Sequence, residues 1–232
     1  MIEKILKTKT GKLHLKLPEH LHEVTLGQLI DMQSTENMSD LQAIQILSGI
    51  PVEELQNIKD FKDLQMFNDQ VTKLSQQIKE LYNSDSLPKS ITFNIDSKAV
   101  KVKVITNLSI EPAGAFLAAR DVITEEINKH IEQYGEDWKT NFNPSLKTCA
   151  MLLAHYFYCP VSNNWYNEYQ AEAFYDEVIK LPFTDALPIA KYFFLNYPSL
   201  SKPKISYWLR AQLLWKKRLA LNRFKNSGML TP

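Results

Sequence analysis

The sequence predicts a mainly helical α+β protein, in which a helical bundle is joined to a small antiparallel sheet in the N-terminal half. Glycine is scarce, with 6 residues in 232, so tight β-turns are few. Long stretches repeat apolar residues at spacings of three, four and seven, as amphipathic helices do. Shorter stretches alternate apolar and polar residues, as half-buried strands do. The hydrophobic content of 44% is that of an ordinary globular protein.

The first expected elements are a strand and a helix. Residues 12–17 (KLHLKL) alternate, and Pro18 ends the strand. Thr25 and Gln28 have the spacing of a capping box, so a helix is expected to begin near Leu26.

Two short helices and one long helix are expected next. Ser39 should cap a helix over residues 40–47 that ends at Gly49, and Pro51 should begin another helical turn. Asp60 should open a helix that reaches residue 82. Its apolar positions form one stripe: Phe61, Leu64, Phe67, Val71, Leu74, Ile78 and Leu81.

A β-hairpin is expected at residues 91–105. Residues 91–95 and 99–105 alternate, and Asp96, Ser97 and Lys98 lie between them. Because an isolated hairpin is marginally stable, we expect it to recruit the strand at 12–17 into a three-stranded sheet. A junction at 107–112 would then divide the chain into an N-terminal α+β half, 1–108, and a C-terminal helical bundle, 109–232.

Five helices delimited by prolines are expected in the C-terminal half. They begin at Pro112, near Pro144, at Asn167, after a cap at Thr184 or Asp185, and at Pro203. The first should end at Gly135 and the last near Lys225. We expect this half to bury Leu152, Leu153, Phe157, Ile189, Phe193 and Phe194.

Metal ligation is weakly indicated, and no cofactor is expected. His155 and Cys159 are four apart on one helical face, with Cys149 nearby, but no further zinc ligands stand at a usual spacing. We therefore expect these residues to pack in the core and no metal to bind. His20 and His22 are expected at the surface.

The carboxylates are not arranged for catalysis. Asp121, Glu125 and Glu126 lie beside Arg120 and Lys129, which favours a solvated, charge-balanced helix face. The motifs of nucleophile elbows, phosphate-binding loops, dinucleotide sites and zinc proteases are all missing from the sequence. We therefore expect a protein that is not an enzyme.

Charge is strongly segregated along the chain. Residues 1–185 hold all 26 acidic residues and 18 of the 27 basic ones, a net −8, whereas residues 186–232 hold nine basic and no acidic residues, a net +9. Such asymmetry indicates an electrostatic partner for the basic end. The candidate partner-binding residues are Lys204, Trp208, Arg210, Trp215, Lys216, Lys217, Arg218, Arg223 and Lys225.

Three interpretations of this last segment remain open. Its aromatic residues could join the core while its basic residues are solvated. Basic residues interleaved with aromatic ones also suit nucleic acid. Finally, the segment could dock on an acidic protein neighbour or on the acidic body of the next subunit. A membrane surface is less favoured, because its polar and apolar arcs are not cleanly separated.

Compartment signals are few. Two cysteines favour a reducing environment, and the N-terminal residues lack the apolar core of a signal peptide. Apolar runs are far shorter than the ~18 residues that span a bilayer. We expect synthesis in the cytoplasm and no membrane partner.

Three stretches together resemble small proteins of the head–tail modules of tailed bacteriophages, including crAss-like gut phages. They are HEVTLGQLIDMQ (22–33), DLQAIQILSGIPVEELQNI (40–58) and FYDEVIKLPFTDALPIAKYFF (174–194). Such proteins include tail-assembly chaperones, neck components and virion cargo. The resemblance carries no catalytic residues.

The resemblance implies a non-enzymatic structural, cargo or assembly protein, made in the host cytoplasm and carried in the virion. It would act through protein–protein contacts in a multi-copy or homo-oligomeric complex, with portal, neck or tail components as partners. Packaged DNA is a further expected contact. The alternative function is a nucleic-acid-associated protein that binds through the basic C-terminal helix.

Overall fold

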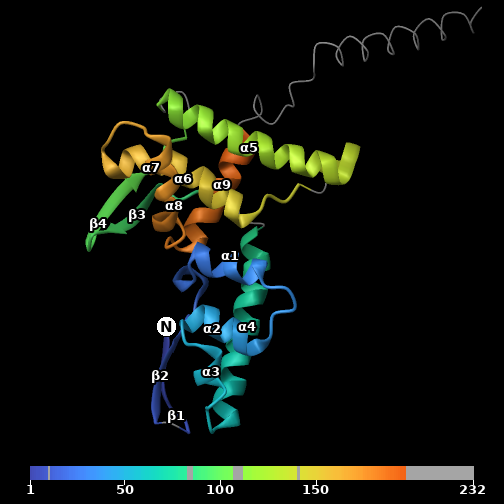
Figure 1. The fold of residues 1–232 in the computed structure, drawn as a ribbon, viewed down its shortest axis with the longest axis vertical. Coiled ribbons are helices and arrows are strands. Elements are labelled where there is room, and N and C mark those ends of the chain that lie inside the picture. The colour runs from blue at the N-terminus through green and yellow to red at the C-terminus, as the bar shows by residue number, and fades with distance from the viewer. Residues whose placement is uncertain (10, 83–85, 107–111, 140–141, 197–232) are drawn as a thin grey trace, which may run out of the picture.

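The computed structural model describes residues 1–9, 11–82, 86–106, 112–139 and 142–196. These residues form a mainly helical molecule with two separate antiparallel two-stranded sheets, which confirms the predicted fold class. The molecule is elongated and has two lobes, one above the other in Figure 1. A single hydrophobic core runs through both lobes.

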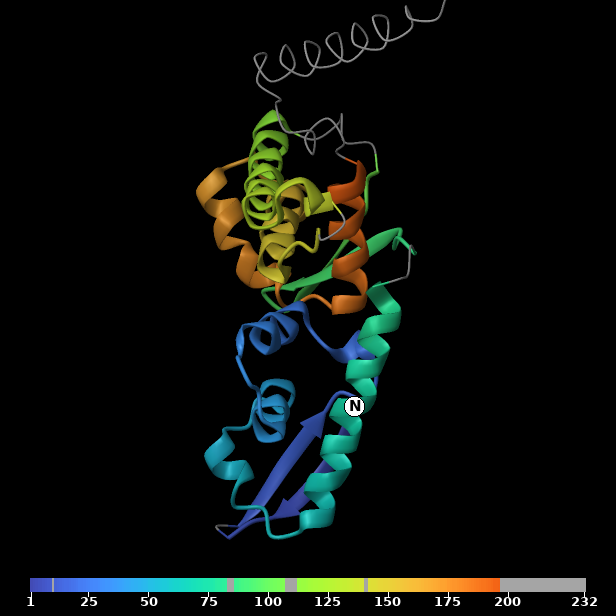
Figure 2. The ribbon, with the colours of Figure 1, turned by 90° about the vertical axis from the view of Figure 1, so that its right-hand side faces the viewer.

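The lower lobe packs one hairpin against helices. Its elements are β1 (Ile2–Lys7), β2 (Lys12–Leu17), α2 (Asp40–Ser48), α3 (Val52–Leu55) and α4 (Phe61–Tyr82). Leu6, Leu15 and Leu17 of the hairpin are fully buried with Ile44 of α2 and Phe67 of α4. Figure 2 shows α4 running along the height of this lobe.

The predicted three-stranded sheet is wrong. Strand β2 pairs with β1, from Ile2 opposite Leu17 to Lys7 opposite Lys12, and not with the second hairpin. The β1 strand escaped prediction because its alternation is broken. Lys4 lies on the half-buried face, where it forms an ion pair with Asp63 of α4, while Ile5 points outward.

Local capping signals in the sequence correctly predicted the starts of two helices and the end of one. The Thr25 hydroxyl accepts the Gln28 N–H at 3.2 Å, and the Gln28 side chain accepts the Thr25 N–H at 2.9 Å. This capping box begins α1 (Leu26–Ser34). Ser39 begins α2 in the same way, and Gly49 ends it with a φ of +74°.

The upper lobe is built around α6 (Leu146–Ser162). Around it lie α5 (Ala113–Tyr134) with the short helix η3 (Gly135–Lys139), α7 (Glu168–Ala173), α8 (Tyr175–Val178) and α9 (Phe183–Asn196). The predicted core of this half is confirmed, since all six of its residues are buried: Leu152, Leu153, Phe157, Ile189, Phe193 and Phe194.

The second hairpin, β3 (Ser90–Ile95) and β4 (Lys98–Lys103), packs on the upper lobe. The Phe93 ring lies 5.3 Å from the rings of both Phe157 and Phe174. The Tyr156 hydroxyl holds the backbone after β4, donating to the Ile105 carbonyl at 2.8 Å. The sheet expected with the N-terminal half therefore lies with the C-terminal helices, while the chain division at residue 108 stays a prediction.

Two helices of the upper lobe differ from expectation. The helix expected from Asn167 is two short helices, because the Glu177 N–H bonds the Phe174 carbonyl at 3.0 Å and tightens the backbone there. The expected cap at Thr184 or Asp185 is wrong. The Asp185 N–H already bonds the Pro182 carbonyl at 3.0 Å, so α9 begins at Phe183.

Backbone hydrogen bonds join the lobes. The first N–H groups of α1, which lack helical partners, donate to carbonyls of the chain between α8 and α9. These two bonds run from the Leu26 N–H to the Leu181 carbonyl (2.9 Å) and from the Gly27 N–H to the Ile179 carbonyl (2.8 Å). A third bond runs in the other direction, from the Phe183 N–H to the Val24 carbonyl (2.9 Å). Gly27 suits this contact, because a Cβ there would lie 3.1 Å from the Ile179 carbonyl oxygen.

Candidate functional site

The connection from α6 to α7 places a tryptophan in solvent. Asn163 ends α6 in the left-handed conformation, with a φ of 56°. The Asn167 side chain then begins α7 by accepting the Gln170 N–H at 3.1 Å. Between them, Tyr166 is half-buried and Trp165 is 95% exposed.

Tyr166 anchors this connection. Its hydroxyl lies 2.9 Å from Nδ1 of buried His155, and its ring packs where a side chain on Gly114 would stand. Burial, followed by the nearby Glu168 carboxylate, raises the pKa of Tyr166 to about 12. Burial also lowers the pKa of His155, which favours its neutral imidazole.

Exposed aromatic and acidic side chains lie on α7, on the connection before it and at α8. We define the acidic–aromatic surface as Trp165, Glu168, Tyr169, Glu172 and Asp176. Tyr169 is 83% exposed, and the three carboxylates are also exposed. Residues 163–176 contain no Lys or Arg. Within the described part of the chain, none of the three carboxylates is in an ion pair.

This arrangement suits a macromolecular partner. Large aromatic side chains bury much apolar area with few rotatable bonds, and they dominate the binding energy of many protein interfaces. The unneutralised carboxylates add a preference for a basic partner. The sequence signal was present in the run from Trp165 to Asp176, but a helix pattern alone does not tell which of its aromatic residues tertiary contacts leave uncovered.

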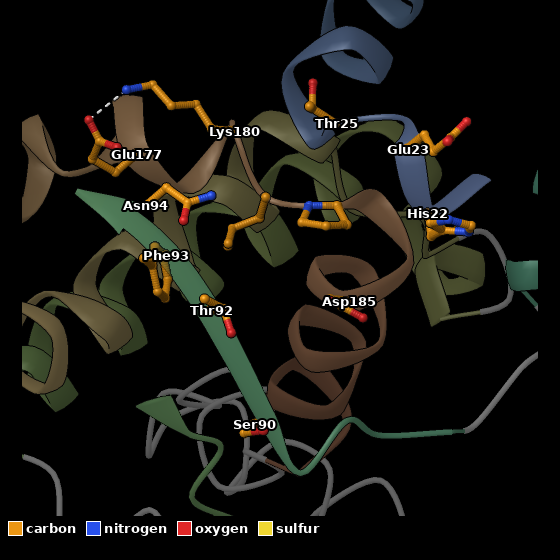
Figure 3. A pocket seen from close by; sticks show the side chains of 12 residues that line it. His22, Glu23, Thr25, Ser90, Thr92, Phe93, Asn94, Glu177, Lys180 and Asp185 are labelled. Atoms are coloured by element: carbon orange, nitrogen blue, oxygen red, sulfur yellow. Dashed lines mark hydrogen bonds and ion pairs between the residues drawn. The ribbon is translucent and has the colours of Figure 1, made fainter. Parts of the chain in front are cut away.

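A cavity of about 500 Å³ with a mixed polar and apolar lining lies between the lobes (Figure 3). Its polar lining residues come from the chain before α1, from β3, and from α8, α9 and the chain between them: His22, Glu23, Thr25, Ser90, Thr92, Asn94, Glu177, Lys180 and Asp185. Burial raises the pKa of Asp185, while the nearby His22 opposes this change. Lys180 pairs with Glu177 at 2.6 Å. A second carboxylate of the lining, Glu23, pairs with the Met1 amino group.

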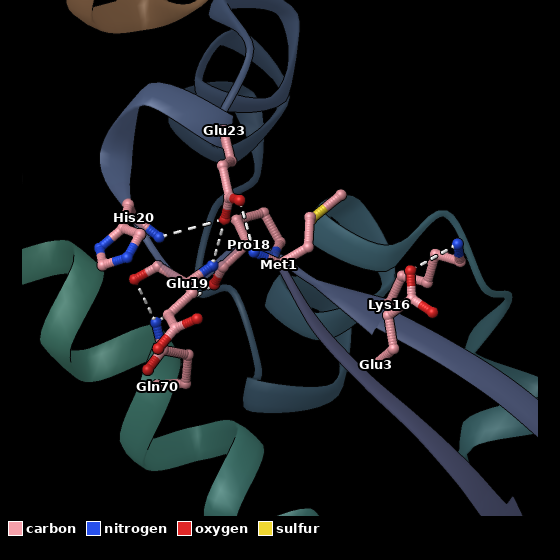
Figure 4. A network of polar contacts seen from close by, with 8 residues as sticks. All are labelled: Met1, Glu3, Lys16, Pro18, Glu19, His20, Glu23 and Gln70. Carbon is pink, nitrogen blue, oxygen red and sulfur yellow. Dashed lines mark hydrogen bonds and ion pairs between the residues drawn. The ribbon is translucent and has the colours of Figure 1, made fainter.

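A polar network beside the cavity fixes the chain between β2 and α1 (Figure 4). The Glu23 carboxylate accepts from the Met1 amino group and from the Glu19 N–H at 2.7 Å, and these donors lower its pKa to about 2. Gln70 of α4 donates to the Glu19 carbonyl at 2.8 Å. His20 and His22 are exposed, as expected, and their rings stack 5.4 Å apart. These contacts position the backbone.

The carboxylates of α5 are only partly as expected. Asp121 and Glu125 are exposed in ion pairs with Arg120 (2.9 Å) and Lys129 (2.8 Å). The expectation for Glu126 is wrong, because it is only 5% exposed.

Glu126 caps the start of α6. Its carboxylate accepts the Ser145 N–H at 2.7 Å and the Thr148 hydroxyl at 2.8 Å. A carboxylate is well placed at a helix N-terminus, where backbone N–H groups lack helical partners. The chain before α6 passes over α5 at this point, and no local pattern in the sequence foretells that packing.

The residues whose spacing weakly indicates metal ligation are His155, Cys149 and Cys159. His155 is bonded to Tyr166, and burial raises the pKa of Cys149 to about 12, so its thiol stays protonated. Burial also raises the pKa of Cys159. Across the part of the chain that the structure describes, no three His, Cys, Asp or Glu side chains are grouped as metal ligands would be.

The predicted partner-binding residues lie outside the described residues. These are Lys204, Trp208, Arg210, Trp215, Lys216, Lys217, Arg218, Arg223 and Lys225. No described helix combines the length and apolar character that crossing a membrane requires. Comparison of the chain with protein-family models, curated proteins and solved structures found no match.

Proposed function

We propose that the protein is a non-catalytic structural, cargo or assembly protein of a tailed bacteriophage, held by protein–protein contacts in a multi-copy complex. One observation carries the binding role: Trp165 is 95% exposed on a surface whose carboxylates form no ion pair with any other described residue. An exposed aromatic of this size on an anchored backbone is typical of an interface hot spot.

A polypeptide partner fits the surface better than a small ligand does. Small ligands are held in concave, mostly apolar pockets that cover most of their area. Trp165 and Tyr169 instead stand in solvent on α7 and the connection before it. Contacts of this kind gain binding energy when a partner covers the rings and excludes water around them.

The phage context rests on the three stretches that resemble head–tail module proteins. The first, at residues 22–33, and the third, at residues 174–194, meet through the backbone hydrogen bonds that join the lobes. Stretches far apart in the chain thus belong to one structural unit, which supports considering them together.

The test is incorporation of the protein into particles. We expect Trp165→Ala with Tyr169→Ala to lower the copies per purified particle, or per assembly intermediate, by about tenfold or more. Quantitative mass spectrometry measures this loss. The matched control is Tyr134→Ala, an exposed aromatic at the far end of α5, about 30 Å from its first turn. Normal incorporation of the folded double variant contradicts the proposal.

Nucleic-acid binding is the second candidate, favoured by nine basic and no acidic residues in positions 186–232. Each phosphate contact contributes a slope of about −0.9 to log K against log salt on duplex DNA. Five such contacts would give a slope of about −4 to −5. Binding of the isolated protein to DNA without that dependence contradicts this candidate.

A further inference from the structure

We infer that the acidic–aromatic surface binds the basic carboxyl-terminal segment, residues 197–232, of a second copy of this chain. The inference rests on the proposed function and names the partner of the same surface. It would make the protein its own assembly partner, with one donor segment and one acceptor surface in each copy.

Charge complementarity identifies the occupant. The surface presents Glu168, Glu172 and Asp176 on a stretch without Lys or Arg, whereas residues 197–232 carry eight Lys and Arg and no Asp or Glu. Opposite charges of this kind steer association and fix its orientation. The exposed rings of Trp165 and Tyr169 add faces on which Lys and Arg groups stack favourably.

Three other carboxylates of the upper lobe are already in ion pairs. Asp121 and Glu125 on α5 pair with Arg120 and Lys129, and Glu177 on α8 pairs with Lys180. A basic segment would have to displace these partners, which gives little net gain for exposed pairs. Glu168, Glu172 and Asp176 are in no ion pair with another described residue, so no such partner would have to be displaced there.

The placement of α9 favours a second copy over the same molecule. Figure 2 shows α7 and α9 on opposite sides of α6. The helix α9 ends at Asn196, the last described residue, so residues 197–232 follow a helix that lies across α6 from the acceptor surface. A donor and an acceptor on different sides of one molecule produce a head-to-tail contact, which builds rings or open chains rather than closed dimers.

Two full-length variants test this contact in trans. The acceptor variant carries Glu168→Lys, Glu172→Lys and Asp176→Lys. The donor variant carries Lys216→Glu, Lys217→Glu and Arg218→Glu. We expect the wild-type protein to self-associate with increasing concentration and each variant to associate at least about tenfold more weakly. Mixing them should form a 1:1 complex, because the acceptor variant keeps its own donor segment and the donor variant keeps its acceptor surface.

Sedimentation velocity at low and high salt measures these states. The matched control is Asp121→Lys with Glu125→Lys, a charge reversal on α5 that should leave self-association unchanged. A wild-type protein that stays monomeric at all concentrations, or a mixture that forms no complex, overturns the inference. The inference is also overturned if no mixed complex forms while the acceptor variant still binds duplex DNA.

These outcomes are distinct from a failure of the proposed function. If the mixed complex fails to form while Trp165→Ala with Tyr169→Ala still lowers particle incorporation, the surface binds a different protein. If the mixed complex forms while particle incorporation is normal, self-association holds and the phage role fails.

Discussion

At the scale of single residues, two neighbouring carboxylates on α5 have different roles. Glu125 is exposed in an ion pair, whereas Glu126 accepts two hydrogen bonds at the start of α6. We predict that Glu126→Ala lowers the free energy of unfolding by about 1–3 kcal/mol, because the partly buried Ser145 N–H and Thr148 hydroxyl lose their acceptor. Urea unfolding measures the change. Glu125→Ala, the matched control, should change stability by less than about 0.5 kcal/mol.

Buried His155 should make stability depend on pH. Its folded pKa lies below the unfolded value of 6.5, so the unfolded chain binds more protons as the pH falls below that value. Its favourable contribution is therefore complete above pH 6.5 and declines as the pH falls through 6.5 toward the folded pKa. Urea midpoints between pH 5 and 8 would show this decline, and His155→Gln should reduce it. An identical pH profile for both proteins contradicts the assignment.

Residue burial was predictable where apolar periodicity decides it. Leu152, Phe157 and Phe193 were expected in the core and are buried there. Glu126 and Trp165 were not foreseen, because their surroundings depend on which distant segment covers them. A helix pattern identifies faces, but tertiary packing decides which polar residue is enclosed and which aromatic residue stays in solvent.

At the scale of elements, one glycine sets how the α6–α7 connection packs. A Cβ on Gly114 would lie 2.5 Å from the Tyr166 ring. We predict that Gly114→Ala lowers the free energy of unfolding by about 1–3 kcal/mol, because the overlap outweighs the helix propensity that alanine gains.

The prediction for Gly114 separates packing from propensity through a double-mutant cycle. In a Tyr166→Ala background the overlap is gone, so Gly114→Ala should become neutral or stabilising. Thermal or urea unfolding of the four proteins gives the coupling. Equal costs in both backgrounds would show that the ring contact is not the cause.

Element boundaries followed from the sequence where side chains cap their own helices. The Thr25 capping box, the Ser39 cap and the Gly49 end are local signals, and all three are confirmed. Strand β1 was missed because Lys4 turns inward to Asp63, and the start of α9 was missed because Pro182 begins its first turn. The first depends on a contact between segments distant in the chain, whereas the second depends on the Pro182 carbonyl, three residues before Asp185.

At the scale of the whole molecule, one core links the two lobes. Phe193 packs with Tyr156 at a ring distance of 4.4 Å, and Tyr156 also holds the backbone after β4. We predict that Phe193→Ala lowers the free energy of unfolding by about 3–5 kcal/mol. Because the core is continuous, circular dichroism and tryptophan fluorescence should report one shared transition. An unchanged midpoint contradicts this packing.

The arrangement of the lobes could not be predicted from the sequence. Hydrophobic patterns indicated the β3–β4 hairpin but not its position on the upper lobe, which Phe93 fixes through Phe157 and Phe174. The acidic–aromatic surface was likewise not predicted, because the run from Trp165 to Asp176 does not tell which of its residues tertiary contacts leave uncovered. The basic C-terminal segment, by contrast, was evident from charge alone, and it stays a prediction.

The most direct test of the binding role is the solvent exposure of Trp165 in the free and assembled protein. Oxidative footprinting resolved by peptide mass spectrometry measures the labelling of this ring before and after assembly. The account predicts heavy labelling of Trp165 and Tyr169 in the free protein and about tenfold less when assembled, with Tyr134 unchanged. Equal labelling of Trp165 in both states would contradict the claim that this surface makes the contact.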